Sequence, residues 1–218
     1  MRRTLTVIAT LAAAVLAAVA PAASAAAAPP SGEGGQPVYA PGARCTLGFN
    51  VRQNGAYYFL TAGGCAKAGL TLYADPALTV ELGTVVAVTN VAVGLVRYVE
   101  PQVERPGSVR LYPGSQDITS AGNPVVGQRV CRSGPATGVR CGTVTAVNVT
   151  VHFPEGTITG LARTTICPEP GDTPGAPYFS GTTAVGLGIG GTGDCASGGS
   201  SFFQPVNPVL SAFGVSVY

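Results

Sequence analysis

From Cys45 onward, short apolar runs alternate with turn residues at the spacing typical of β-strands. Many of these runs are rich in Val, Thr, Tyr and Phe, which favour strands, and Asn54-Gly55 between two of them is a hairpin signal. No long helical period separates the runs, so the pattern predicts an all-β fold, a barrel or a sandwich. The predicted strands are Thr46–Val51, Ala56–Ala62, Thr79–Val88, Val91–Val99, Val125–Cys131, Gly142–Phe153, Ile158–Thr165, Thr182–Ile189 and Ser201–Gln204.

The C-terminal part of the chain departs from this strand pattern. Residues 206–213 carry apolar side chains at helical spacing. Asn207 with Pro208 fits a helix start, and Gly214 fits a helix stop. One short C-terminal helix is therefore expected.

The N-terminus has the pattern of a secretory signal peptide. Arg2 and Arg3 precede an apolar stretch over residues 5–19, and small residues follow at 22–26. We expect a signal peptide over 1–25, cleaved between residues 25 and 28. The apolar stretch is too short for a comfortable membrane span and no second candidate follows. A secreted, extracellular protein without a membrane span is predicted, preceded by a flexible leader over 26–42 that is rich in Pro, Gly and Ser.

Charge narrows the range of partners. The chain has 12 Lys and Arg against 10 Asp and Glu; loss of the two signal arginines leaves 12 − 2 = 10 basic residues, a near-neutral mature chain. There are no basic runs, which argues against nucleic-acid binding. The 31 glycines and 18 prolines, with only 10% charged residues, fit a loop-rich β protein. We expect a monomer.

Six cysteines in an exported chain predict three disulfides. Six cysteines allow about fifteen different sets of three disulfides. The order of the cysteines suggests that sequence neighbours pair. Each bridge would contribute on the order of 3 kcal/mol. A metal site is the alternative, but there is no C-x-x-C pair and the only histidine, His152, is far from zinc-type spacing, so no metal or cofactor is expected. The suggested pairs are Cys45–Cys65, Cys131–Cys141 and Cys167–Cys195.

From Gly42 to Tyr218 the chain resembles the streptogrisins, bacterial chymotrypsin-type serine proteases close to alpha-lytic protease. The resemblance implies two six-stranded antiparallel β-barrels with a short C-terminal helix. It places a peptidase-like domain at 43–218, with barrels over about 43–118 and 119–218, and it supports the same three disulfides. The matching stretches are CTLGFNV at 45–51, YYFLTAG at 57–63, GLVRY at 94–98, QDIT at 116–119, CPEPGD at 167–172 and LSAFGVSVY at 210–218.

The same resemblance locates the catalytic positions, and the usual residues are absent from them. Thr61-Ala62-Gly63-Gly64-Cys65 is similar to the histidine motif of the family, with Gly64 at the general base. Ala92 stands at the orienting aspartate and Thr173 at the nucleophile. Ile189 stands at the serine that hydrogen-bonds the aspartate in the family.

These replacements agree with one another. A buried carboxylate without partners is costly, and both Ala92 and Ile189 are apolar. A hydroxyl without a base is a weak nucleophile, and Pro174 restricts the backbone of Thr173. His152 is expected on a surface hairpin of the second barrel, so it does not supply the base. The resemblance therefore predicts a catalytically inactive protease homologue.

Other features of the family's site have matching residues here. The resemblance implies an oxyanion-hole-like turn with the backbone N–H groups of Gly171 and Thr173, and a structural ion pair between Asp172 and Arg132. It also implies a peptide-binding edge at Ile189, Gly190 and Gly191, to which an extended peptide could add as a strand.

Three functions are open from the sequence. The first is an inactive homologue that binds peptides or proteinaceous protease inhibitors. The second is a weak residual serine/threonine-type endopeptidase or esterase that uses Thr173. The third is a structural exported scaffold. The family is made with a long pro-region that the protease itself removes, and the short leader over 26–42 suggests a chain that folds without a full pro-region.

Overall fold

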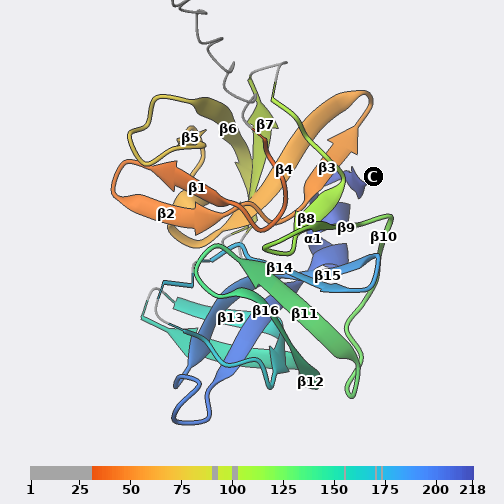
Figure 1. The fold of residues 1–218 in the computed structure, drawn as a ribbon. Helices are drawn as coiled ribbons and strands as arrows, with labels where there is room; N and C mark the ends of the chain where they lie inside the picture. The colour runs from red at the N-terminus through yellow and green to blue at the C-terminus, as the bar shows by residue number, and fades with distance from the viewer. Residues whose placement is uncertain (1–30, 90–92, 100–102, 155, 170, 173) are drawn as a thin grey trace, which may run out of the picture.

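The computed structural model describes residues 31–218 except 90–92, 100–102, 155, 170 and 173. The described part is built almost entirely of strands, arranged as two units stacked one above the other (Figure 1). The first unit holds β1 (Pro37–Ala40), β2 (Ala43–Thr46), β3 (Asn50–Gln53), β4 (Ala56–Ala62), β5 (Thr71–Tyr73), β6 (Glu81–Val88) and β7 (Val93–Tyr98), with the 3-10 helix η1 (Gly63–Cys65) after β4.

The second unit follows a short hairpin of β8 (Ser108–Arg110) and β9 (Ser115–Asp117). Its sheet has the order β10-β15-β14-β11-β12-β13-β16 and is closed by pairing of β15 with β16. The strands are β10 (Ser120–Ala121), β11 (Arg129–Gly134), β12 (Gly138–Phe153), β13 (Gly156–Thr164), β14 (Pro177–Ser180), β15 (Thr183–Thr192) and β16 (Ser200–Pro205).

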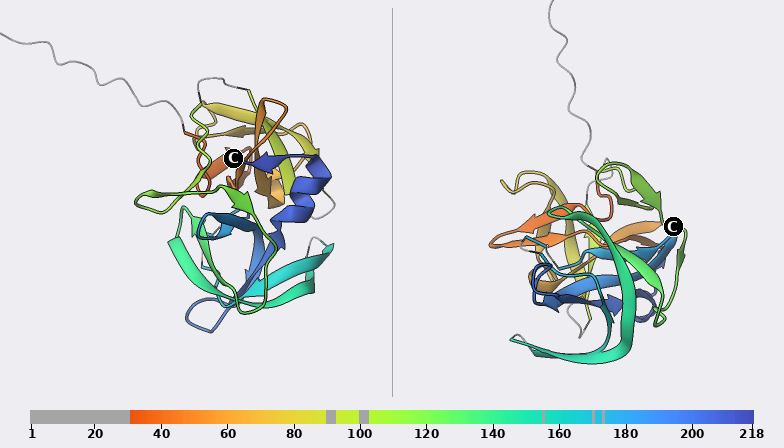
Figure 2. Two further views of the ribbon diagram at one scale, coloured as in Figure 1. Left: turned by 90° about the vertical axis from the view of Figure 1, so that its right-hand side faces the viewer. Right: turned by 60° about the horizontal axis from the view of Figure 1, so that its bottom comes forward.

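The chain ends with α1 (Val206–Phe213) and β17 (Ser216–Val217). The helix begins directly after Pro205 and ends at Gly214, which adopts the left-handed conformation (φ 66°) that favours glycine. It leads the chain back to the first unit, where β17 pairs with β3 (Figure 2). The first sheet therefore has the order β17-β3-β4-β7-β6-β5-β1-β2.

Each unit has its own apolar core, and a third core joins them. Phe49 and Leu60 of the first unit pack in one buried cluster with Leu187 of the second and Val206 of α1. The approach is close: a Cβ atom on Gly48 would lie 2.1 Å from Leu187 Cδ2, so only glycine fits there. Interiors packed at this density fix the position of one unit against the other, which fixes the residues that line the seam between them.

The all-β fold with two β-units and a short C-terminal helix is confirmed, as are all three disulfides. In the described part of the chain the two large sheets have eight and seven strands rather than six each, since short segments such as β2, β10 and β17 extend them. β10 pairs with β15 in parallel. Among the described residues, no helix is long and apolar enough to cross a bilayer.

The N-terminal segment also differs from the expectation. A flexible leader was predicted over 26–42, but residues 31–40 instead lie against the first unit, with β1 paired to β2 and β5. The segment is held from distant positions: Asn50 Nδ2 donates to the backbone carbonyl of Gly32, and Ser108 Oγ donates to the side-chain Oε1 of buried Glu33 at 2.6 Å. The Gly- and Pro-rich composition did not reveal these long-range contacts.

Candidate functional site

The turn after β4 is the first component of the candidate site. Cys65 is tied to Cys45 of β2, and Thr61 Oγ1 donates to the carbonyl of Thr46 at 2.9 Å, so both ends of the turn are anchored. Gly64 is exposed on this anchored turn: among the described residues, a Cβ atom placed there would meet only Ala43 Cβ, in ordinary contact at 3.8 Å. The position has room for a side chain, and the sequence supplies none.

Pro174 brings the second unit against this turn. A Cβ atom on Gly63, whose φ is 67°, would lie 2.7 Å from Pro174 Cβ, so the proline ring packs directly on Gly63. The carbonyl of Pro174 also accepts a hydrogen bond from the N–H of Thr46 at 2.9 Å. The ring therefore occupies the space beside the position of the general base in the predicted motif.

Asp172 and Arg132 form a buried ion pair, which the sequence placed together. Arg132 Nη2 lies 2.7 Å from Asp172 Oδ2, and the two side chains are 5% and 12% exposed. Thr137 Oγ1 accepts from Arg132 and donates to Asp172 Oδ1 at 2.9 Å, while the N–H of Glu169 donates to Asp172 Oδ2. Four polar groups thus form one connected network around the Asp172 carboxylate, which fixes that side chain in place.

The edge of β15 is the third component. Gly190 and Gly191 pair with β16 on one side, and no described strand pairs with them on the other. A Cβ atom on Gly190 would lie 3.0 Å from Phe153, so the phenylalanine ring flanks this edge. An extended chain could hydrogen-bond to the free backbone groups here, as in strand addition.

A cavity of about 190 Å³ lies next to this edge. Tyr178 and Ser201 line it together with Ile189, Pro174 and the Arg132–Asp172 pair. Tyr178 is fully buried, and burial raises the pKa of its phenol, which stays neutral at physiological pH. Ile189 contributes a half-buried apolar side chain to the wall of this cavity.

Several predicted residues are not part of this arrangement. Ala92 and Thr173 lie outside the described residues. Gly171 is described, in the left-handed region (φ 88°) next to Ala136. His152 is exposed on β12, with Nδ1 2.7 Å from Thr157 Oγ1 of β13, so its ring is engaged within the hairpin.

Sequence reasoning missed Phe153, Pro168 and Tyr178, which flank the edge and line the cavity. Only the apolar character of Phe153 beside His152 on a predicted strand could have drawn attention to it. The described residues also include one trio of potential metal ligands, Cys167, Glu169 and Cys195. The two cysteines form a disulfide and offer no thiolate, so this trio does not fit a metal ion.

Comparison with known proteins places the chain among bacterial serine proteases. It is 46% identical to streptogrisin-D of Streptomyces griseus over 188 residues, which cover 84% of this chain but 47% of the relative. It is 44% identical to glutamyl endopeptidase 2 of the same organism, with 85% of this chain and 98% of the relative covered. No protein-family model matches the chain.

Solved structures agree with these sequence relatives. An alpha-lytic protease homologue, N4, superposes with a TM-score of 0.78 at 46% identity, covering 85% of this chain and 98% of that one. A glutamic acid-specific serine protease that uses a histidine triad in substrate binding superposes equally well, with a TM-score of 0.78 at 41% identity.

Proposed function

The chain belongs to the streptogrisin and alpha-lytic protease-like family of chymotrypsin-fold serine proteases, and we propose that it is an exported member that binds extended polypeptides without cleaving them. The proposal rests on two features of the turn after β4. Gly64 offers no base although the position has room for one, and Pro174 packs against its neighbour Gly63.

The expected size of the catalytic loss supports binding without cleavage. Removal of a single member of a catalytic triad costs factors of about 10⁴ to 10⁶ in turnover. Here Gly64, Ala92 and Thr173 replace all three members. The only histidine, His152, is engaged with Thr157 on an exposed hairpin. Oxyanion-hole and binding effects alone leave on the order of 10³-fold acceleration over water, too little for a working protease.

The binding side of the site supports retention of a peptide ligand. The Asp172–Arg132 pair is buried and holds its loop, and the edge at Gly190 and Gly191 has free backbone groups flanked by Phe153. An extended segment would add as a strand at this edge and direct one side chain toward the adjoining cavity. Substrate-like peptides and the exposed loops of protease inhibitor proteins both have this extended form.

The test measures binding and hydrolysis on the same protein. A fluorescently labelled tetrapeptide amide, Ala-Ala-Pro-Phe, is titrated with purified mature protein, and anisotropy reports binding. In parallel, hydrolysis of the corresponding p-nitrophenyl ester is compared with that of the Thr173→Ala variant. We expect saturable binding of the peptide. We also expect ester hydrolysis at the background level, with the same rate in Thr173→Ala as in the unmodified protein.

Two outcomes would reject the proposal. Absence of binding at high micromolar peptide, and to a proteinaceous inhibitor of the relatives, would favour an exported scaffold without a ligand at this site. Ester hydrolysis that disappears in Thr173→Ala would identify a threonine-dependent hydrolase instead.

A further inference from the structure

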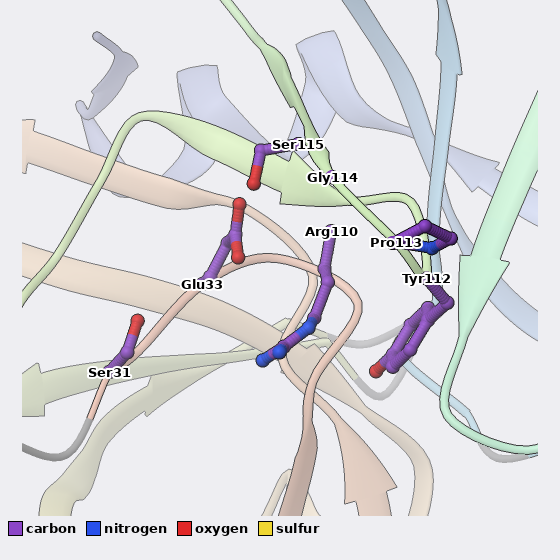
Figure 3. A pocket seen from close by; sticks show the side chains of 7 residues that line it. All are labelled: Ser31, Glu33, Arg110, Tyr112, Pro113, Gly114 and Ser115. Carbon is purple, nitrogen blue, oxygen red and sulfur yellow. The ribbon is translucent and has the colours of Figure 1, made fainter. Parts of the chain in front are cut away.

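Two further cavities lie where the N-terminal segment meets the β8–β9 hairpin. The larger has a volume of about 660 Å³ and the smaller about 510 Å³, and Ser31, Arg110 and Tyr112 line both (Figure 3). None of their lining residues belongs to the candidate site described above. Volumes of this size are typical of small-molecule sites.

Two arginines give this region its charge. Arg44 of β2 and Arg110 of β8 both line the smaller cavity, and both are exposed. Within the described part of the chain, no carboxylate lies within ion-pair distance of either guanidinium. Two guanidinium groups without a fixed counter-ion at one cavity favour an anionic ligand, because each presents a planar fork of donors that matches a carboxylate.

Glu33 limits where the anion could lie. It lines the larger cavity but not the smaller, and its Oε1 accepts from Ser108 Oγ at 2.6 Å. In Figure 3 the Glu33 carboxylate is directed toward Ser115, whereas the guanidinium of Arg110 lies below it in the view, between Ser31 and the Tyr112 hydroxyl. Repulsion from Glu33 therefore directs an anion toward the smaller cavity, and it favours a single negative charge over a double one.

Tyr112 is fixed in place at the boundary of the two cavities. Its φ of 55° lies in the left-handed region, which a bulky aromatic residue rarely adopts. Its hydroxyl donates to the carbonyl of Gly35 at 2.7 Å, and the guanidinium carbon of Arg110 lies 5.5 Å from the ring centre. Backbone strain of this kind persists where surroundings enforce it and is common at ligand sites.

The wall of the smaller cavity combines polar and apolar groups. Its accessible apolar part comes from the half-buried Pro37, Ala74 and Pro135, whereas Val38, Leu47 and Leu82 behind them are fully buried. From the cationic rim and these accessible apolar groups together, we propose that this cavity binds a monoanionic apolar carboxylic acid, with the carboxylate at Arg44 and Arg110 and the apolar group against Pro37, Ala74 and Pro135. The C-terminal residue of a peptide and a free aliphatic acid share this chemistry.

The probe is N-acetyl-L-leucine, with N-acetyl-L-leucinamide as the uncharged match. Each is titrated into the ¹⁵N-labelled mature protein, and NMR follows the backbone amides of Gly35 and Tyr112. We expect saturable shifts with the acid, at a Kd on the order of 1 mM, and binding of the amide weaker by at least about tenfold. Equal affinity for acid and amide would overturn the proposal.

Variants assign the contact to the two arginines. Arg110→Gln and Arg44→Gln are each expected to weaken binding of N-acetyl-L-leucine by about tenfold. Arg140 is an exposed arginine of β12 outside both cavities, and Arg140→Gln should leave this binding unchanged. Because two separate variants are made, misfolding of one still leaves the other as a test. Thermal unfolding checks that each variant is folded. Acid binding that survives both substitutions would overturn the proposal.

Two further ligands separate the possible sources. Gly-Gly-Leu with a free C-terminus represents a peptide end, and hexanoate represents a free aliphatic acid. Binding of either supports the shared chemistry and identifies the source, whereas failure of both, together with N-acetyl-L-leucine, refutes it.

Discussion

The two sides of the candidate site depend on different kinds of groups. On the first-unit side, the family's chemistry needs a side chain on the turn after β4, and Gly64 has none. On the second-unit side, the Asp172–Arg132 pair and the backbone of β15 remain. Side-chain chemistry can be removed by substitution with little effect on packing. Backbone geometry and buried ion pairs persist because the fold depends on them, so binding can outlast catalysis.

Installing the family's catalytic side chains at the predicted positions should have the largest effect. We predict that Gly64→His, Ala92→Asp, Thr173→Ser, Pro174→Gly and Ile189→Ser, made together, raise peptidase activity by at least about 10³-fold over the unmodified chain. Gly64 is exposed and admits a Cβ atom, and Pro174 is replaced because it restricts the backbone of Thr173 and its ring packs on the neighbouring Gly63. Hydrolysis of a peptide p-nitroanilide measures the gain.

The control for this reconstruction carries the other four changes together with Thr173→Ala, and should stay at background. An inactive reconstruction with intact disulfides and native circular dichroism would mean that the second-unit side has diverged as well. The contrast between the two sides would then fail.

The two sides should also differ in their effect on stability. Asp172→Ala leaves the 5%-exposed side chain of Arg132 without its counter-ion, and we expect it to lower the free energy of unfolding by about 3–5 kcal/mol. Gly64→Ala places a Cβ at an exposed position, in ordinary contact with Ala43 Cβ and without left-handed backbone. It should change the free energy of unfolding by no more than about 0.5 kcal/mol. Urea denaturation of the two single variants measures both.

A double variant checks the cause of the larger effect. Asp172→Leu combined with Arg132→Met removes both charges, and should destabilise less than Asp172→Ala because no uncompensated charge stays buried. A similar loss in the double variant would assign the effect to packing. Equal stability of Asp172→Ala and Gly64→Ala would remove the distinction between the two sides.

Much of the fold could be predicted because the motifs and the alternation pattern are local. The helix over 206–213 was correct, since Gly214 marks its end. Strand boundaries were less accurate where the ladder is irregular: β12 runs from Gly138 to Phe153, with Asn148 at φ 56° and several register shifts against β13.

The remaining features depend on contacts between residues far apart in the chain. The docking of the N-terminal segment uses Asn50 and Ser108, which lie 18 and 75 residues from their partners Gly32 and Glu33. Phe153 reaches Gly190 only because β12, β13, β16 and β15 follow one another around the closed sheet. Composition and periodicity contain no record of such approaches, so the flank of the edge and the arginine-lined cavities emerged only from the structure.

Phe153 provides a test of the difference between the two sides of the candidate site, with the smallest expected effect. It would contribute a side chain to peptide binding on the second-unit side, where the other proposed contacts come from the backbone. Its ring flanks Gly190 and is only partly buried, so a bound peptide would cover it. We predict that Phe153→Ala weakens binding of the tetrapeptide amide by about tenfold, the loss of one apolar contact, with little change in stability. Val147→Ala, an exposed apolar residue on the same strand, is the matched control. If anisotropy shows the same affinity for both variants and the unmodified chain, the affinity of the second-unit side comes from its backbone alone.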